Sequence, residues 1–229
     1  MTTPPDPKWP RLLALSVHEF RTPVTVVAGY IRMLLKDRAG AVTDQQRRLL
    51  EEAEKSCGRL SAIISEMSDL SNLEAQTAPF NRSALDLGAL LADTVAALPE
   101  VPDREITVTL RPGPEAFSVS GDPVRLKSAL AAIFTALRRE LVTTTELLVR
   151  TRKGEYDGRP AVWIAIADAD HIDGLASGNA DALTTFDEWR GGCGLSLAVA
   201  RRVIDAHGGA LWSPADGTKA GAVLALPLA

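Results

Sequence analysis

Hydrophobic residues in the first third of the chain recur at spacings that alternate between four and three positions. The positions are Leu13, Val17, Phe20, Val24, Val27, Ile31 and Leu34. This spacing predicts an amphipathic helix whose apolar seam packs in a helical bundle. The stripe ends at Asp37-Arg38-Ala39-Gly40, where a glycine suits the end of a helix.

A second helix is predicted to start after Thr43, because Gln46 follows three residues later and the pair forms a capping-box signature. Its apolar seam comprises Leu49, Ala53, Leu60, Ile63, Met67 and Leu70. Two antiparallel helices bury one stripe each, which is thin for a stable unit, whereas two such hairpins make a four-helix bundle. We therefore predict a homodimer through residues 10–76, preceded by a frayed terminus over residues 1–9.

From Thr77 onward the pattern changes to short β-like runs between helices. Helices are predicted over 85–97, 123–140 and 194–207, and strands over 106–110, 145–152, 161–167, 210–212 and 222–226. Asp122 and Pro123 provide the cap and first position of the middle helix. Interleaved strands and helices predict a two-layer α/β sandwich over residues 77–229, with adjacent strands antiparallel.

Composition narrows the class of protein without naming a function. The 229 residues are 46% hydrophobic and 24% charged, with a net charge of −4, which excludes global disorder and non-specific nucleic-acid binding. Cys57 and Cys193 are too far apart to suggest a disulfide framework or a metal site. Neither a membrane span nor a signal peptide is evident. We expect a cytoplasmic protein with no nucleic acid, membrane or metal ion as partner.

The segment Ser16 to Pro23 carries the first candidate chemistry. His18 lies beside the buried seam and should point to solvent, with Glu19 adjoining it and Thr22 one turn after Glu19. A carboxylate that accepts the proton of one imidazole nitrogen makes the other a better nucleophile. A proline inside a helix destabilises the helix by about 3 kcal/mol, because it removes a backbone hydrogen bond. We therefore expect that the helix bend or the weakened backbone at Pro23 has a use. From these residues alone, His18 could equally be an exposed histidine without a function.

His-Glu-Phe-Arg-Thr-Pro closely resembles the phospho-accepting H-box of two-component sensor histidine kinases, and residues 69–75 resemble the end of that family's second dimerisation helix. The resemblance implies that His18 carries a phosphoryl group and that Glu19 is the general base for its phosphorylation. Glu19 and Thr22 also match the family's motif for hydrolysing phospho-aspartate on a partner. The resemblance assigns no clear role to Arg21, and a solvated salt-bridge residue is its simplest interpretation.

The same resemblance implies a gyrase-type ATPase sandwich with four nucleotide-binding boxes. Aligned on Gly121-Asp122-Pro123, the family's magnesium-holding Asn and its neighbour one turn earlier fall on Ala136 and Ala132. A methyl group supplies none of the hard oxygen ligands that Mg²⁺ needs. Arg139 falls where the family often has a basic residue near the phosphates, although a surface charge is an equal interpretation.

The glycine-rich boxes are only partly kept. The second box reads Asp168-Ala169-Asp170-His171-Ile172, which keeps the adenine-recognising aspartate but lacks both glycines that let backbone approach a nucleotide. The fourth has Gly192 and Gly194 at the start of a helix, where free N–H groups suit an anion. A glycine turn that packs helix against sheet is the alternative, and the lid before it is short.

The leading hypothesis is a histidine phosphotransferase that exchanges a phosphoryl group between His18 and the aspartate of a response-regulator receiver domain. The receiver should cover Thr22, Val26 and Tyr30, with Arg32 contributing charge. Its own aspartate and Mg²⁺ would complete the site, so no tightly bound cofactor is expected in this chain. The alternatives are an ATP- and Mg²⁺-dependent histidine kinase with a divergent site, and a non-catalytic regulator of a receiver or kinase.

Overall fold

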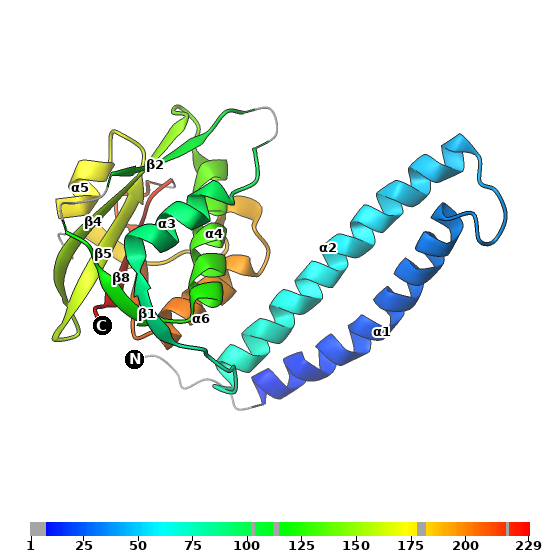
Figure 1. The fold of residues 1–229 in the computed structure, drawn as a ribbon, viewed down its shortest axis with the longest axis horizontal. Coiled ribbons are helices and arrows are strands. Elements are labelled where there is room, and N and C mark those ends of the chain that lie inside the picture. The colour runs from blue at the N-terminus through cyan, green and yellow to red at the C-terminus, as the bar shows by residue number, and fades with distance from the viewer. Residues whose placement is uncertain (1–7, 102–103, 112–114, 178–181, 219) are drawn as a thin grey trace. The chain divides into compact units, whose positions relative to one another are not determined.

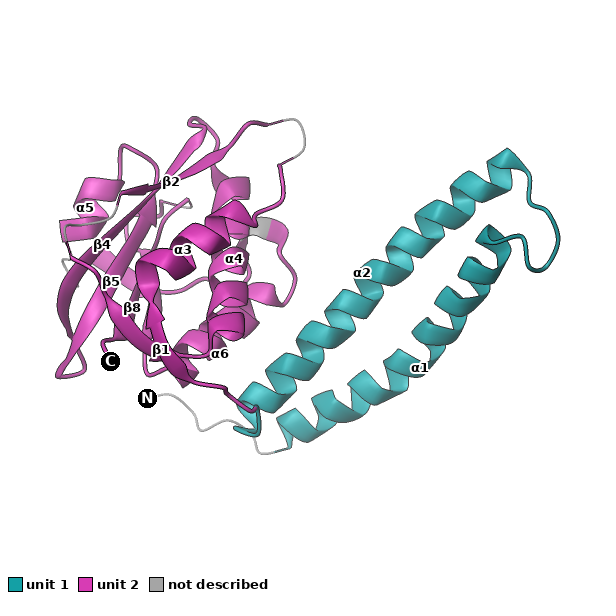
Figure 2. Cartoon of the chain, viewed as in Figure 1, with its two compact units in different colours: residues 1–78 teal, residues 79–229 magenta. Residues whose placement is uncertain are grey.

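The structure is a computed structural model that describes residues 8–101, 104–111, 115–177, 182–218 and 220–229. The chain forms two compact units, residues 1–78 and residues 79–229 (Figure 2). The predicted helical hairpin followed by an α/β domain is confirmed.

The first unit is a hairpin of α1 (Trp9–Leu35) and α2 (Asp44–Glu74). The predicted capping box starts α2. The Thr43 hydroxyl accepts the N–H of Gln46 at 3.3 Å, and the Gln46 side chain accepts the N–H of Thr43 at 2.9 Å. The N–H groups at the start of a helix have no partner within the helix, and here two of them are bonded by side chains only three residues apart. The start of α2 can therefore be predicted from the local sequence.

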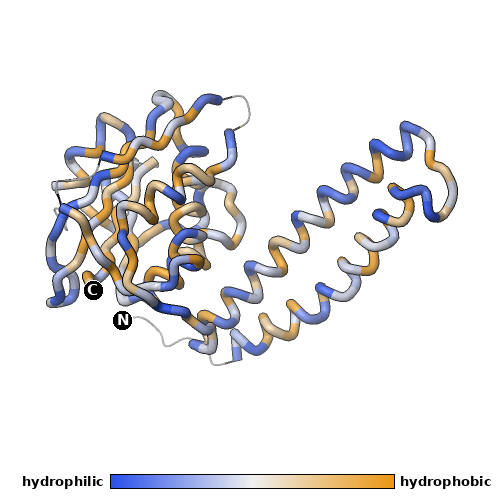
Figure 3. Tube along the Cα trace, viewed as in Figure 1, coloured by the Kyte–Doolittle hydropathy of each residue, from blue (hydrophilic) through white to orange (hydrophobic). Residues whose placement is uncertain are grey.

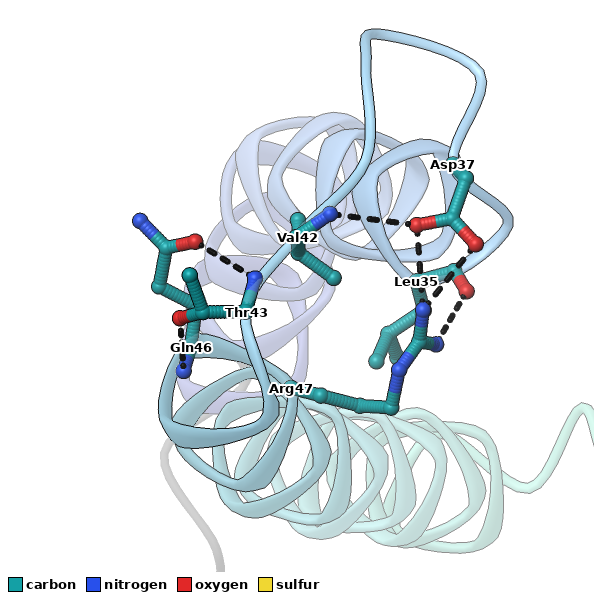
Figure 4. Close-up of polar contacts among 6 residues, drawn as sticks. All are labelled: Leu35, Asp37, Val42, Thr43, Gln46 and Arg47. Carbon is teal, nitrogen blue, oxygen red and sulfur yellow. Dashed lines mark hydrogen bonds and ion pairs between the residues drawn. The ribbon is translucent and has the colours of Figure 1, made fainter.

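Arg47 fastens the loop between the two helices (Figure 4). Its guanidinium donates to the Leu35 carbonyl at 2.7 Å and to both carboxylate oxygens of Asp37 at 3.0 Å. The Asp37 carboxylate also accepts the N–H of Val42 at 3.3 Å. One side chain thus satisfies a carbonyl at the end of α1 and holds Asp37, whose φ of +53° is rare for a residue with a side chain.

The apolar seams divide between a buried and an exposed set. The buried hydrophobic residues of the hairpin are Leu13, Val17, Ala28, Ile31, Cys57, Ile64 and Leu73. Five predicted seam residues stay exposed instead, namely Phe20, Val27, Leu49, Leu60 and Ile63. Within the first unit α1 and α2 pack against each other, and hydrophobic residues recur along both helices (Figure 3). The hairpin by itself leaves these five side chains exposed, so their burial in a bundle of two hairpins stays a prediction.

The second unit contains a mixed sheet and several helices (Figure 1). Its helices are α3 (Leu87–Ala96), α4 (Pro123–Glu140), α5 (Ile172–Ser177), the 3₁₀ turn η2 (Arg190–Gly192) and α6 (Ser196–Ala206). Its strands are β1 (Ser83–Asp86), β2 (Thr107–Arg111), β3 (Ser118–Gly121), β4 (Glu146–Tyr156), β5 (Arg159–Ala167), β6 (Leu183–Thr185), β7 (Ala210–Pro214) and β8 (Ala222–Pro227).

The six-stranded sheet has the order β2-β4-β5-β8-β7-β6, and β1 and β3 form a separate antiparallel pair. β2 and β4 are parallel, so the prediction that all adjacent strands are antiparallel was wrong at this edge. The crossover through α4 brings the chain back in the same direction, which local sequence patterns do not reveal. The sequence also gave no signal for the short elements α5 and β6.

The two faces of the sheet are covered differently (Figure 1). Val162, Ile164 and Ile166 of β5 are fully buried on the face covered by α3, α4 and α6. Trp163 and Ala165 alternate with them and therefore lie on the opposite, outer face, where α5 packs. The inner face forms the main core, and the outer face is closed by one short helix and by aromatic side chains.

His207 anchors the first residues of the second unit. Its Nδ1 lies 2.7 Å from the Val203 carbonyl, its Nε2 accepts the N–H of Asp122 at 3.0 Å, and Phe80 meets its ring edge-on at 5.2 Å. The Asp122 carboxylate accepts the N–H of Asn81 at 2.8 Å and caps α4. Burial lowers the pKa of His207, which keeps the ring neutral. His207 therefore lies at the C-terminal end of α6 and links it to the start of α4.

Candidate functional site

His18 presents an accessible imidazole on α1. Its side chain is 80% exposed, and its Nδ1 lies 3.2 Å from the carboxylate of Glu19, which is itself 69% exposed. The tautomer with a proton on Nδ1 fits this contact and leaves Nε2 with its lone pair directed to solvent. The predicted pair of a nucleophilic nitrogen and an adjacent base is therefore brought together.

The position of His18 around the helix separates it from both apolar sides of α1. Successive residues turn by about 100°, so His18 lies roughly 120° from the buried side that carries Val17 and farther from the exposed side that carries Val27. Thr22, Thr25 and Gly29 follow His18 along the same side. A Cβ built on Gly29 meets nothing within 4 Å, so this side is open.

Pro23 loosens the helix one turn after the imidazole. Because proline has no N–H, the carbonyl of Glu19 has no helical donor at the usual position four residues later. The Thr25 hydroxyl donates to the Arg21 carbonyl at 2.8 Å, a bond of the kind that bends helices. The backbone next to His18 is thus less constrained than the rest of α1.

A hollow of about 210 Å³ lies between the two helices, lined on α1 by residues that follow His18 along the chain. Arg21, Val24 and Thr25 line it from α1, and Ser61, Ile64 and Ser65 line it from α2. Arg21 and Thr25 were not predicted as site residues, since no pattern in one helix shows what the other helix leaves uncovered. The two small serines of α2, Ser61 and Ser65, which are four residues apart, are the hint that the sequence offers.

The residues expected to meet a receiver are all exposed on α1. Val26 and Tyr30 are 48% and 63% exposed, and Thr22 is exposed as well. Arg32 forms an ion pair with Glu54 of α2 at 3.2 Å. Thr22 and Arg32 lie on the side of His18, whereas Tyr30 is roughly 120° away around the helix, next to the exposed apolar stripe.

In the second unit, the aspartate expected to recognise adenine is engaged by its own loop. The Asp168 carboxylate accepts the N–H of His171 at 3.1 Å and lies 2.6 Å from the Nδ1 of the His171 ring. Its side chain is only 11% exposed. The hydrogen bond that the His171 ring makes to the Asp168 carboxylate raises the pKa of His171. His171 sits between the two positions where the family has glycines, and both of its contacts are made to Oδ1, one of the two oxygens of the carboxylate expected to recognise adenine.

The positions of the expected magnesium ligands lie on α4. Ala136 is fully buried and Ala132 is half-buried, and neither carries an oxygen donor. Across the part of the chain that the structure describes, no cluster of three or more His, Cys, Asp and Glu side chains could hold a metal ion. These residues therefore provide no ligand set of the kind that Mg²⁺ prefers.

The glycine turn before α6 is braced by protein groups. Arg139 donates to the Gly192 carbonyl at 3.2 Å and approaches the Cys193 Sγ at 3.6 Å. Gly192 and Gly194 have φ values of +57° and +63°, the left-handed conformation that glycine adopts without strain. Arg139 thus meets the predicted glycine turn, but it binds the turn's own carbonyl rather than pointing to an unfilled anion site.

Comparison with known proteins shows what this chain is similar to. Residues 11–76 match the His Kinase A (phospho-acceptor) domain. The sensor histidine kinase GacS of Pseudomonas protegens is 27% identical over 94% of this chain and 24% of its own length. The phosphate regulon sensor protein PhoR of Pseudomonas aeruginosa is 28% identical over 83% of this chain and 43% of its own length. The chain thus spans less than half of each of these relatives.

Two solved structures share the fold. The crystal structure of full-length ShkA in complex with AMPPNP aligns with a TM-score of 0.72 and 23% identity, over 96% of this chain and 46% of that one. The Acinetobacter baumannii histidine kinase AdeS aligns with a TM-score of 0.56 and 20% identity, over 92% and 98% of the two chains.

Residues 11–76 thus match a phospho-acceptor domain, and the chain is similar in sequence to sensor histidine kinases and shares their fold. Among the described residues, no helix combines the length and the apolar character needed to cross a membrane.

Proposed function

We propose that the protein is a histidine phosphotransferase that exchanges a phosphoryl group between His18 and an aspartate of a response-regulator receiver domain. The observation that carries the proposal is the contrast between the two candidate sites. His18 is exposed beside its base, whereas Asp168 is already bonded to His171 and the magnesium positions are alanines.

The chemistry follows from the His18–Glu19 pair. The Nε2 lone pair of His18 attacks the phosphorus of an aspartyl phosphate on the receiver. The bond from phosphorus to the aspartate oxygen breaks, and the aspartate leaves as a carboxylate. The Nδ1 proton of the phosphorylated ring passes to the Glu19 carboxylate, which leaves a neutral phosphoimidazole. Transfer in the other direction retraces these steps.

The receiver would contact the exposed side of α1 that follows His18, including Thr22 and Arg32, with Val26 and Tyr30 at the margin. Thr22 is also placed to orient water for hydrolysis of the aspartyl phosphate, together with Glu19. The carboxylates and the Mg²⁺ of the reaction would belong to the receiver. The residues at the nucleotide boxes of this chain do not fit Mg²⁺–ATP, so no step is assigned to them.

Homodimerisation through residues 10–76 is part of the proposal, with residues 77–229 as a degenerate ATPase-like domain. The exposed apolar side chains of α1 and α2, among them Phe20, Val27 and Leu60, need cover that one hairpin does not give. A second hairpin supplies that cover in a four-helix bundle. His18 would remain outside this bundle core because it lies away from the apolar side of α1.

The test uses the full chain and a receiver domain carrying a radiolabelled aspartyl phosphate. Label should move to the wild-type protein as an acid-labile phosphohistidine, and His18→Gln should lower this transfer by more than about 100-fold. His171→Gln is the matched control and should transfer normally. Equal labelling of His18→Gln contradicts the proposal.

A second arm incubates the chain alone with labelled ATP and Mg²⁺. The proposal expects no label on His18. Appreciable labelling identifies an ATP-dependent kinase instead, and tight receiver binding without any transfer identifies a non-catalytic regulator.

A further inference from the structure

The outer face of the sheet contains a cavity of about 290 Å³ between α5 and strands β4, β5 and β8. Ala165 and Val223 form its floor, and Trp163 and Leu175 stand on either side. Its volume is close to the lower end of the range for small-molecule sites. α4, which carries the expected magnesium positions, covers the other face of the sheet (Figure 1), whereas α5, which lines the cavity, starts at the last residue of the second nucleotide box, Ile172.

Strand register explains why the cavity exists. Arg150, Ala165 and Val223 are neighbours across β4, β5 and β8, and Arg152 pairs with Trp163 in the next row. The methyl group of Ala165 is short beside the indole of Trp163 and the packed helix α5. Ala165 is only 3% exposed and packs with Leu175 and Val223, so a gap remains at the edge of its methyl group, where a larger side chain would have filled the outer face.

The aromatic wall of the cavity is held rigidly. Trp163 stacks on Trp212 with centroids 5.2 Å apart and ring planes 9° apart, and its Nε1 donates to the Glu155 carbonyl at 3.2 Å. Tyr156 meets both indoles edge-on. A Cβ on Gly154 would lie 2.9 Å from the Trp163 ring, so glycine there lets the indole lie against β4. A preformed wall loses little conformational entropy when it binds a ligand.

Positive charge dominates the rim. The Arg152 guanidinium lies 4.9 Å from the centre of the Trp163 ring, and Arg150 forms an ion pair with Asp173 of α5. The Asp173 side chain is 83% exposed, so it can move aside without leaving a buried carboxylate. Two guanidinium groups opposed by one mobile carboxylate favour an anion at this edge.

We propose that this cavity is a binding site for a compact organic anion, with an apolar or aromatic body over Ala165 and a carboxylate or phosphate group at Arg150 and Arg152. The body would replace water over the methyl floor and against the indole edge. The anionic group would pair with the guanidinium groups and displace Asp173. The site is independent of phosphotransfer at His18, since it uses none of the residues of the hairpin.

The test titrates 2-naphthoate into the full chain and follows backbone amide signals of Trp163, Ala165 and Ala176 by NMR. Saturable shifts are expected, and the neutral amide 2-naphthamide should bind at least about tenfold more weakly. Phenyl phosphate distinguishes a phosphate preference from a carboxylate preference. Absence of shifts with both anions, or equal binding of 2-naphthoate and the neutral amide, overturns the proposal.

Variants that remove a charge from the rim should change the affinity for naphthoate in opposite directions. Arg152→Ala should weaken naphthoate binding by about tenfold, and Asp173→Ala should strengthen it several-fold by removing the competing carboxylate. Arg159→Ala is the matched control, because it removes an exposed arginine from the far end of the same hairpin. Unchanged affinity in both Arg152→Ala and Asp173→Ala refutes the charge assignment.

Filling variants test the location. Ala165→Leu should abolish binding by occupying the floor. Ala176→Phe fills the cavity from α5. Ala176 is only half-buried, so the larger side chain should disturb folding less there than at the buried Ala165. Naphthoate binding that survives in a folded Ala176→Phe protein places the ligand elsewhere and ends the proposal.

Discussion

The two units treat histidine in opposite ways. In the hairpin, His18 is 80% exposed with one ring nitrogen beside Glu19 and the other open to solvent. In the sandwich, His207 is only 6% exposed, and both of its ring nitrogens face backbone groups. A histidine side chain is thus accessible to a reaction partner in one unit, whereas in the other unit both of its ring nitrogens are engaged by the backbone.

The units also differ in how complete their cores are. The sandwich buries its strands on the inner face, whereas the hairpin leaves several large apolar side chains exposed. Burying one such side chain contributes roughly 1.5–3 kcal/mol. In the proposed dimer a second hairpin would supply this contribution to the first unit, whereas the sandwich buries its core within the chain. The proposed phosphotransfer residue His18 lies on the unit that the proposed dimer would complete.

The sharpest way to break this comparison is to place a charge on the exposed apolar side of α1. Val27→Asp should weaken self-association of the full chain by more than about 100-fold, because a carboxylate without a partner is costly in an apolar interface. Sedimentation velocity over a range of concentrations measures the change. Thr22→Asp, on the side of His18, should leave association intact. A dimer that tolerates Val27→Asp contradicts the bundle.

The next largest effect is expected at the former magnesium position. Ala136→Asn should lower the free energy of unfolding by about 2–4 kcal/mol, since it forces a polar amide into a fully buried site. Chemical denaturation measures the loss. Ala132→Asn, at a half-buried position, should cost less. Gain of ATP binding without loss of stability in Ala136→Asn shows instead that this side of α4 still faces a cleft.

The anchor at His207 predicts a pH dependence. Its pKa is lowered in the folded state, first by burial, so the unfolded chain binds the proton more readily. Stability is therefore present above the unfolded pKa of about 6.5 and falls as the pH drops below it, until the folded pKa is reached. His207→Ala should cost about 2–3 kcal/mol at pH 7.5 and remove this slope.

Urea unfolding between pH 5 and 8 measures the slope, and His18→Gln should keep it because that ring is exposed in both states. Other charged groups at the anchor are Arg82, Arg125 and Asp122, so their substitution would shift the midpoint of the slope. A slope of the same size in His207→Ala assigns the effect to other groups.

The smallest predicted effect is at the loop between α1 and α2. Arg47→Ala should destabilise the hairpin by about 1 kcal/mol, because it removes a partly exposed ion pair with Asp37 and a bond to the Leu35 carbonyl. Thermal unfolding at low and high salt measures the loss, which should shrink as salt screens the ion pair. Arg48→Ala removes an exposed neighbouring arginine and should have no effect. Equal losses of stability in the two variants would show that the contacts of Arg47 do not stabilise the loop.

Much of the fold could be predicted because the deciding signals are local. The capping box at Thr43 and Gln46 and the proline after Asp122 fix helix starts within a few residues. The continuous apolar run over 161–167 predicts the strand β5 for the same reason. The parallel pairing of β2 with β4 was missed, since it depends on which distant segment supplies the neighbouring strand.

The sequence by itself determined the hairpin, the α/β domain, and the placing of His18 next to Glu19, because a helical period of 3.6 residues and adjacency along the chain are properties of short segments. Tertiary structure alone decided which apolar residues one hairpin buries, that His171 turns onto Asp168, and that Ala165 leaves a gap beside Trp163. Those outcomes depend on the volume and direction of side chains that meet from separate segments, and no local pattern encodes such meetings.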